Sequence, residues 1–188
     1  MFIFSKNDYI KIIEGLKKSG IEVNGTYEHI AASIKLTCDT KRIKEIFSIS
    51  DEFEREFVEA ITHFKEKKIG PYITEKYFGL IPALKESMRQ LVDDCVETRR
   101  CVIQFPPEHC FQSMQFILRE NTVNVVCYMR SCDAVKNLPH DIWICSKMAD
   151  IYSSYLESML KIHPYAERKI SISFGSLHVY KEDVKDVF

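Results

Sequence analysis

The chain has 188 residues, of which 46% are hydrophobic, and its 26 basic side chains nearly balance its 27 acidic ones. This composition predicts one globular domain, residues 1–188, that is long enough to bury its own core. The balanced charge argues against a protein that binds nucleic acid or an anionic membrane, because both need a dense block of Lys and Arg. The apolar start turns polar at Ser5, and no apolar run approaches the ~20 residues of a membrane span. We therefore expect a cytoplasmic protein.

Seven cysteines are spread along the chain, an odd number without the Cys-x-x-Cys pairs of a zinc site. This pattern predicts neither a disulfide framework nor a bound metal. We expect most of these cysteines to be reduced and buried, which is the usual state of a free cysteine.

The first half of the chain is predicted to be mainly helical. Ser5, with Asp8 three residues later, resembles a capping box. Apolar residues follow at helical spacing until Gly20, which predicts a short amphipathic helix. Further elements are predicted at 30–38 (a strand), 51–68 (a helix), Gly70-Pro71 (a loop) and 82–96 (a helix).

The second half alternates between strand-like runs and one long helical pattern. Two of the strand-like runs are joined by a tight turn at Glu120-Asn121-Thr122, which predicts a β-hairpin. The predicted strands are 100–105, 113–118, 123–129, 169–174 and the segment 177–180, and the predicted helix is 141–162. This order predicts an α+β fold in which helices pack against a mixed β-sheet.

Four short motifs follow one another in this second half. Cys110 precedes Gln115 by five positions and Arg130 by twenty, and Arg130 opens the sequence Arg-Ser-Cys-Asp. The sequence Leu-Pro-His-Asp then ends at Asp141, and Gly-Ser-Leu-His-Val-Tyr ends at Tyr180. Their order and spacing resemble the thymidylate synthase and deoxycytidylate hydroxymethylase superfamily, and most closely its hydroxymethylase branch. The resemblance implies a compact thymidylate synthase-like fold.

The resemblance also implies a role for each motif. Cys110 would be the nucleophile, and Asp133 would bind the pterin of the cofactor 5,10-methylene-tetrahydrofolate. Glu59 would stand for the family's glutamate that organises water and proton transfers. The two arginines of a Thr-Arg-Arg sequence would reach across a homodimer to the partner's nucleotide phosphate. The implied substrate-binding residues are Arg99, Arg100, Gln115, Arg130, Ser131, Asp141, His178 and Tyr180.

The chemistry of a pyrimidine explains why two of these residue types are needed. Carbon 5 of the ring is a poor nucleophile until a thiolate, here that of Cys110, adds at carbon 6. An ionised Asp141 only accepts hydrogen bonds, which suits the exocyclic amino group of cytosine, whereas an Asn amide suits uracil. Asp141 therefore favours a cytosine nucleotide.

Each assignment has a structural alternative. Those alternatives are a small buried side chain for Cys110, an exposed surface arginine for Arg130, a solvated loop carboxylate for Asp133, a helix N-cap for Asp141, and a half-buried strand pair for His178 and Tyr180.

The chain also departs from the family pattern. Glu59 aligns with the family's glutamate only if the alignment of the two sequences is shifted by one residue. On a helix, a shift of one residue turns the side chain by about 100° around the axis. No phosphate-binding Arg is present near Asn24-Gly25-Thr26, and the chain ends soon after Tyr180. A short tail would close the site poorly, and the water it would admit suits a hydroxymethylase, which needs water as its last nucleophile. The same feature is equally compatible with the loss of folate chemistry.

Three functions are compatible with these features. The first is hydroxymethylation of carbon 5 of dCMP or CMP by a homodimeric, folate-dependent enzyme. The second is a thymidylate synthase-like methylation of a uracil nucleotide. The third is a catalytically inactive nucleotide-binding homologue, because a fold does not fix a function.

Overall fold

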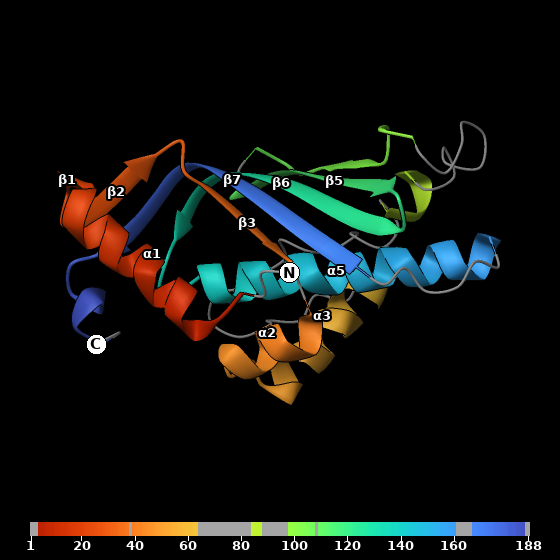
Figure 1. Cartoon of the computed structure of the whole chain (residues 1–188), viewed down its shortest axis with the longest axis horizontal. Coiled ribbons are helices and arrows are strands. Elements are labelled where there is room, and N and C mark those ends of the chain that lie inside the picture. The colour runs from red at the N-terminus through yellow and green to blue at the C-terminus, as the bar shows by residue number, and fades with distance from the viewer. Residues whose placement is uncertain are drawn as a thin grey trace.

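The computed structural model describes residues 4–37, 39–63, 84–87, 98–107, 109–160 and 167–186 (Figure 1). Seven strands form one mixed sheet in the order β1-β2-β7-β6-β5-β4, and β3 continues along β7 beyond the end of β2. β6 and β7 are parallel, and the other pairs are antiparallel. The elements are α1 (Lys6–Ser19), β1 (Ile21–Val23), β2 (Thr26–Ile30), β3 (Ser33–Thr37), α2 (Thr40–Ile46), α3 (Asp51–His63), β4 (Val102–Gln104), β5 (Phe111–Arg119), β6 (Thr122–Asp133), α5 (Leu138–Leu160), β7 (Glu167–Tyr180) and the 3-10 helix η1 (Asp183–Asp186).

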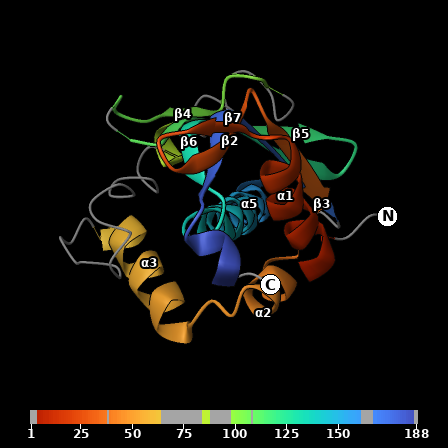
Figure 2. The same cartoon turned by 90° about the vertical axis from the view of Figure 1, so that its left-hand side faces the viewer.

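The described helices lie on one side of the sheet, which confirms the α+β prediction (Figure 2). α5 runs beneath the sheet, and α2 and α3 lie beyond α5. The buried residues form one cluster between these layers. Within it Trp143 of α5 meets Phe57 of α3 edge-on at 5.4 Å, and Phe116 of β5 stacks on Tyr152 of α5 at 5.0 Å between ring centroids. In the part of the chain that is described, no helix combines the length and the apolar character needed to cross a membrane.

Two local sequence signals are confirmed. The Asp8 amide donates to the Ser5 hydroxyl, and the Asp8 carboxylate accepts from the Ser5 amide, so a capping box begins α1. The β5–β6 hairpin turns at Glu120 and Asn121, whose φ angles are 46° and 61°. These left-handed values are the ones that a two-residue type I′ turn requires.

Several predicted boundaries are wrong. The predicted strand 30–38 is interrupted, because β2 ends at Ile30 and β3 begins at Ser33. The Asn24-Gly25 pair, with φ of 47° and 81°, forms the turn of an unpredicted β1–β2 hairpin. α5 begins at Leu138 rather than at 141, because Pro139 is tolerated in the first turn of a helix. The predicted segments 64–68, Gly70-Pro71, 82–83, 88–96 and 161–162 lie outside the described residues.

Partway along β6 and β7, the alternation of inward- and outward-facing side chains is interrupted and shifts by one position. On β6 the buried residues alternate as far as Met129 and resume at Cys132, and on β7 they alternate as far as Phe174 and resume at Leu177. Side chains alternate between the two faces of a strand, so a gap of three positions instead of two reverses which residues face the helices. Beyond this point Cys132 and Leu177, which pair with each other, point inward.

The same shift crosses the neighbouring strands. The pairing of β5 with β6 changes register between Phe111 and Ser113. On the other side, the chain between β2 and β3 turns at Ala31, which has a φ of 55° and donates its amide hydrogen to the Gly175 carbonyl. We call this line of irregularities, through Ala31, Gly175, Arg130 and Gln112, the kink line.

Gly175 is required at the kink line because two backbones approach closely there. A Cβ atom at position 175 would lie 2.7 Å from the Arg130 carbonyl oxygen, which belongs to the backbone of β6 and has little freedom to move. By contrast, a Cβ at Gly15 of α1 would meet nothing within 4 Å.

We expect Gly175→Ala to lower the free energy of unfolding by about 1–3 kcal/mol, because the added methyl group forces β6 and β7 apart. Gly15→Ala is the matched control and should raise it by roughly 0.5–1 kcal/mol, because alanine is the better helix former. Urea denaturation of both variants measures the difference. Equal stability of Gly175→Ala and the unchanged protein would contradict the close approach.

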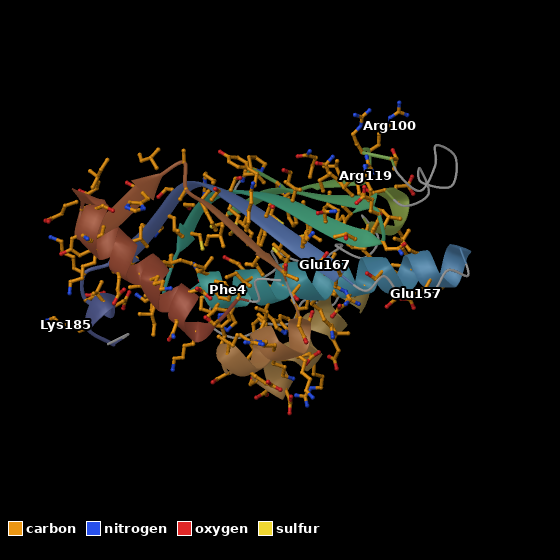
Figure 3. The ribbon with its side chains drawn as sticks, in the orientation of Figure 1. Phe4, Arg100, Arg119, Glu157, Glu167 and Lys185 are labelled. Carbon is orange, nitrogen blue, oxygen red and sulfur yellow. The ribbon has the colours of Figure 1, made fainter. Side chains whose placement is uncertain are left out.

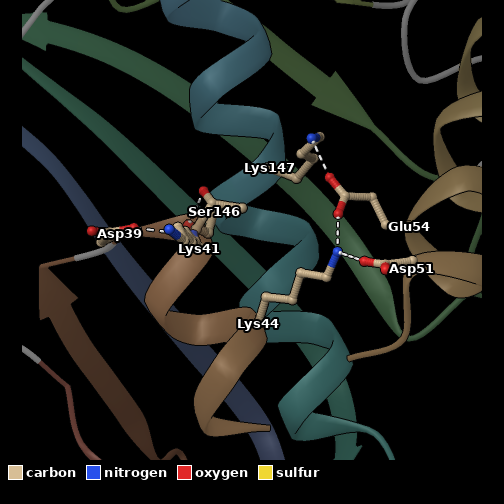
Figure 4. Close-up of polar contacts among 8 residues, drawn as sticks. Asp39, Lys41, Lys44, Asp51, Glu54, Ser146 and Lys147 are labelled. Atoms are coloured by element: carbon tan, nitrogen blue, oxygen red, sulfur yellow. Dashed lines mark hydrogen bonds and ion pairs between the residues drawn. The ribbon is translucent and has the colours of Figure 1, made fainter. Parts of the chain in front are cut away.

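An ion-pair network joins the three helices below the sheet (Figure 4). Glu54 of α3 accepts from Lys44 of α2 at 2.5 Å and from Lys147 of α5 at 2.7 Å, and Lys44 also donates to Asp51 at 2.5 Å. The hydrogen bonds from Lys147 and then Lys44 hold the pKa of Glu54 below its ordinary value. A carboxylate between two ammonium groups therefore fixes α3 against α2 and α5.

The lowered pKa of Glu54 predicts a pH dependence of stability. A carboxyl group with a lower pKa in the folded state stabilises the fold above its unfolded pKa, about 4.5, and loses that contribution as the pH falls through the folded value. Glu54→Gln should therefore be less stable than the unchanged protein at pH 7, and the difference should shrink below about pH 4.5. Glu52→Gln, which removes an exposed pair with Arg55, should have little effect at either pH. A difference for Glu54→Gln that does not change with pH would contradict the role of the charge.

Candidate functional site

Cys110 lies at the kink line, immediately before β5. Its backbone carbonyl accepts from the Arg130 amide at 2.7 Å, and its Sγ atom lies 4.0 Å from the Ser131 hydroxyl oxygen. Five cysteines fall in the described residues, and Cys110 is the one among them that is not fully buried. The structure thus brings Cys110 together with the Arg-Ser pair that follows it by twenty residues, and it gives Cys110 the access that a reactive thiol needs.

The motif residues of β6 and β7 share one face of the sheet. Ser131 is paired with Ser176, and Asp133 is paired with His178. Directly paired residues project from the same face, and His178 and Tyr180 follow Ser176 at every second position. Because Cys132 and Leu177 point inward, this row of polar residues points away from the helices. His178 and Tyr180 therefore face the same side of the sheet, and their rings meet edge-on at 5.7 Å.

Asp133 is buried and bonded to the backbone, so the alternative of a solvated loop carboxylate is wrong. Its side chain is 5% exposed, and its Oδ1 atom accepts from the amides of Val135 and Lys136, each at 2.9 Å. These bonds close the turn between β6 and α5. Both of these hydrogen bonds are accepted by Oδ1.

Asp141 lies in the first turn of α5, and its amide already donates to the Asn137 carbonyl at 2.9 Å. The N-cap alternative is therefore wrong, because the helix has begun three residues earlier. The Asp141 carboxylate is buried and its Oδ2 atom accepts from the Cys132 thiol at 3.4 Å. Burial, followed by the charge of Asp141, raises the pKa of Cys132 well above its ordinary value, so this thiol stays protonated. Asp141 thus reaches the end of β6 from the helix side, whereas Ser131 and Cys110 lie at its outer side.

Gln115 and the two arginines lie at the other end of the site. The Gln115 side-chain amide donates to the Arg99 carbonyl at 2.6 Å, so it links β5 to the segment that carries the two arginines. Arg99 and Arg100 are both exposed. Figure 3 shows the Arg100 side chain extending away from the sheet on the side opposite α5. Both arginines are therefore accessible to a second molecule.

Glu59 lies on α3, and α3 is separated from the sheet by α5 (Figure 2). The face of α3 that carries Phe57 and Ile61 is buried in the core. Glu59 is thus on a different layer from Cys110 and Asp133, which share the strand layer.

The sequence analysis missed two residues that support the site. Tyr9 of α1 donates its hydroxyl hydrogen to the Ala134 carbonyl at 3.0 Å. Burial, followed by the nearby Asp133, raises the pKa of Tyr9 to about 12. Lys136 places its ammonium group 4.9 Å from the Tyr180 ring centroid and pairs with Asp183 of η1 at 2.8 Å. No local pattern identifies Tyr9, because its partner lies 125 residues away.

Glu28 is a third residue that the sequence analysis missed. It is paired directly with His178 across β2 and β7, and its carboxylate accepts a hydrogen bond from the Ser176 hydroxyl. The same hydroxyl oxygen lies 3.5 Å from the Nδ1 atom of His178. A carboxylate from the N-terminal part of the chain thus joins the motif residues of β7.

The search against family models and the search of curated proteins gave no match for this chain.

Proposed function

We propose that this protein is a pyrimidine nucleotide hydroxymethyltransferase that resembles the deoxycytidylate hydroxymethylases. One observation carries the proposal: Cys110, immediately before β5, lies beside the Arg130–Asp133 sequence at the end of β6, and the Ser176–Tyr180 sequence lies on the neighbouring strand β7. These segments are far apart in the chain, and their roles in the proposed chemistry require them to be close together. An isolated buried cysteine would need no such neighbours.

The proposed reaction starts with attack of the Cys110 thiolate on carbon 6 of dCMP or CMP. Carbon 5 thereby gains electron density and receives the one-carbon unit. Loss of the carbon 5 proton, together with cleavage of the bond between the one-carbon unit and the folate nitrogen, would release tetrahydrofolate and leave an exocyclic methylene group. Water would then add to this methylene group, and the bond from Cys110 to carbon 6 would break. The products are the 5-hydroxymethyl nucleotide and tetrahydrofolate, and Cys110 is regenerated.

Methylene-tetrahydrofolate would supply the one-carbon unit, and the Asp133 carboxylate would accept from an N–H donor of its pterin ring. Arg130 would bind the nucleotide phosphate through paired guanidinium hydrogen bonds, with the Ser131 hydroxyl beside it. The Asp141 carboxylate would accept from the exocyclic amino group of cytosine only after exchanging its contact with the Cys132 thiol, because it is buried and reaches the end of β6 from the helix side.

The outer face of the sheet supports a homodimer. Val126 and Tyr128 of β6 are 38% and 48% exposed there, and none of the described helices covers this face (Figure 2). A sheet with one uncovered face gains stability by packing against another layer, and a second copy of this chain supplies one. The Arg100 side chain extends on the same side and Arg99 is exposed beside it in the sequence, which suits the proposal that both reach the partner's nucleotide (Figure 3).

The second candidate function is nucleotide binding without catalysis. It is favoured by the position of α3, which places Glu59 on a different layer from Cys110. Such a protein would still bind the phosphate and the sugar of a nucleotide. It would lack the glutamate that the family uses for proton transfer.

We expect the protein to release tritium from carbon 5 of labelled dCMP or CMP when methylene-tetrahydrofolate is present. Cys110→Ala should reduce the release to the rate seen without protein, because no thiolate adds to carbon 6. Cys145→Ala, which removes a buried thiol from α5, should keep the activity.

The outcomes of this measurement separate the candidate functions. Release from dUMP alone would favour the thymidylate synthase-like reaction over hydroxymethylation. Binding of dCMP without release from any of the labelled nucleotides would favour the inactive homologue.

Removal of both arginine charges should weaken nucleotide binding. We expect the double variant Arg99→Gln, Arg100→Gln to raise the Kd for dCMP about tenfold or more, because each guanidinium makes a charge-assisted hydrogen bond to phosphate. The control is Arg42→Gln, Arg55→Gln, which removes two exposed arginines from α2 and α3. Calorimetric titration of both measures the difference, and an unchanged Kd in the first double variant would contradict the proposed arrangement.

A mixing experiment tests whether the arginines act across a dimer. The Cys110→Ala variant and the double arginine variant should each have low activity alone. If each arginine pair serves the partner's site, a hybrid dimer contains one site with both an intact thiol and intact arginines. Mixing should then restore part of the activity, whereas arginines that serve their own site would give no recovery.

A further inference from the structure

A chain of three polar side chains connects β2 to the end of β7. Glu28 and His178 are directly paired in the antiparallel β2–β7 register, and Ser176 lies two residues before His178 on the same face. The Ser176 hydroxyl donates to Glu28, and the Ser176 oxygen lies 3.5 Å from the Nδ1 atom of His178. All three side chains are half-buried, so this chain is shielded on its inner side and reachable from outside.

The carboxylate at one end determines the direction of the hydrogen bonds. An ionised Glu28 can only accept, so the single hydroxyl hydrogen of Ser176 is directed toward it. The Ser176 oxygen then has only lone pairs to offer to His178. A hydrogen on the Nδ1 atom of His178 would point to this oxygen, whereas a bare Nδ1 would place two acceptors 3.5 Å apart, so the geometry favours the Nδ1–H form.

A neutral imidazole has one N–H group, so a hydrogen on Nδ1 leaves Nε2 as an acceptor. We propose that Glu28 is a positioning residue that acts through Ser176 to hold His178 as the Nδ1–H tautomer, which leaves Nε2 as an acceptor for the sugar hydroxyl that the family resemblance already assigns to this histidine. This inference rests on the proposed function for the identity of the ligand. The tautomer itself does not depend on it.

The neighbouring residue completes a site for a hydroxyl group. The Tyr180 ring meets the His178 ring edge-on at 5.7 Å and is 39% exposed, so both side chains border the same accessible surface. A deoxynucleoside monophosphate has one free sugar hydroxyl, at the 3′ position, because the 5′ oxygen carries the phosphate. An Nε2 acceptor at this place therefore selects a nucleotide with a 3′-hydroxyl over one without it.

The tautomer can be measured directly by nuclear magnetic resonance on protein labelled with ¹⁵N at histidine. At about pH 9 an ordinary imidazole is neutral, and its two ring nitrogens differ in chemical shift according to which one carries hydrogen. His178→Gln identifies the signals of His178 by their loss. We expect the Nδ1–H form, although free histidine favours the Nε2–H form. A spectrum of the unchanged protein with His178 in the Nε2–H form would overturn the proposal.

Two variants test whether Glu28 is the cause. In Glu28→Gln the new side-chain amide can donate to Ser176, which frees the Ser176 hydrogen for Nδ1, so His178 should change to the Nε2–H form. Glu22→Gln is the matched control, because Glu22 of β1 pairs with Lys181 and should leave the tautomer unchanged. Ser176→Ala removes the link, and His178 should return to the preference of free histidine. Retention of the Nδ1–H form in both Glu28→Gln and Ser176→Ala would overturn the role of Glu28.

Binding measurements test the ligand. We expect dCMP to bind the unchanged protein about three to ten times more tightly than 2′,3′-dideoxycytidine monophosphate, the effect of one hydrogen bond. A hydroxyl also accepts hydrogen bonds, so the Nε2–H form expected in Glu28→Gln could still bind it; this ratio therefore tests His178, and the tautomer measurement tests Glu28. Equal binding of the two nucleotides to the unchanged protein would overturn the role of His178 as a hydroxyl acceptor. If neither nucleotide binds, the proposed function fails, while the tautomer measurement still decides the role of Glu28.

Discussion

The close approach of β6 and β7 at Arg130 and Gly175 determines the geometry of the candidate site. At this point, each of the two parallel strands changes which of its side chains face the helices. With uninterrupted alternation, Ser131 and Ser176 would face the core, while Cys132 and Leu177 would face outward. The kink line therefore gathers polar residues on one surface while each strand keeps an apolar face against α5. A glycine is needed because any side chain at position 175 would hold the two backbones apart.

The sequence allowed the motif residues and most elements to be predicted, because strand alternation, helical spacing and capping are local signals. It did not reveal the kink line, whose cause is contact between strands that lie about 45 residues apart in the chain. The partnership of Glu28 with Ser176 was equally invisible, because it joins residues 148 positions apart. The Asn24-Gly25 hairpin, by contrast, was a readable signal that the sequence analysis overlooked.

Several residues of the candidate site serve the fold as well as the proposed chemistry. Asp133 closes the turn that leads into α5, and the Asp141 carboxylate is held by the buried Cys132 thiol. Tyr9 ties α1 to the same turn. Substitution of Asp133 would therefore loosen the β6–α5 connection as well as remove a ligand group. Activity and stability therefore need to be measured together for any variant of Asp133. Cys110 and the exposed Arg100 can be changed with less effect on the core.

The position of β7 in the sheet has a consequence for the order in which the protein assembles. β7 is the last strand in the chain, and it alone joins β1, β2 and β3 to β6, β5 and β4 in the described sheet. During synthesis the first three strands leave the ribosome long before the strand to which they bind. The N-terminal segment must therefore wait for nearly the whole chain, and its apolar residues, such as Leu36, stay exposed meanwhile. Such long-range pairing is slow, and a growing chain is most vulnerable to aggregation and proteolysis during this interval.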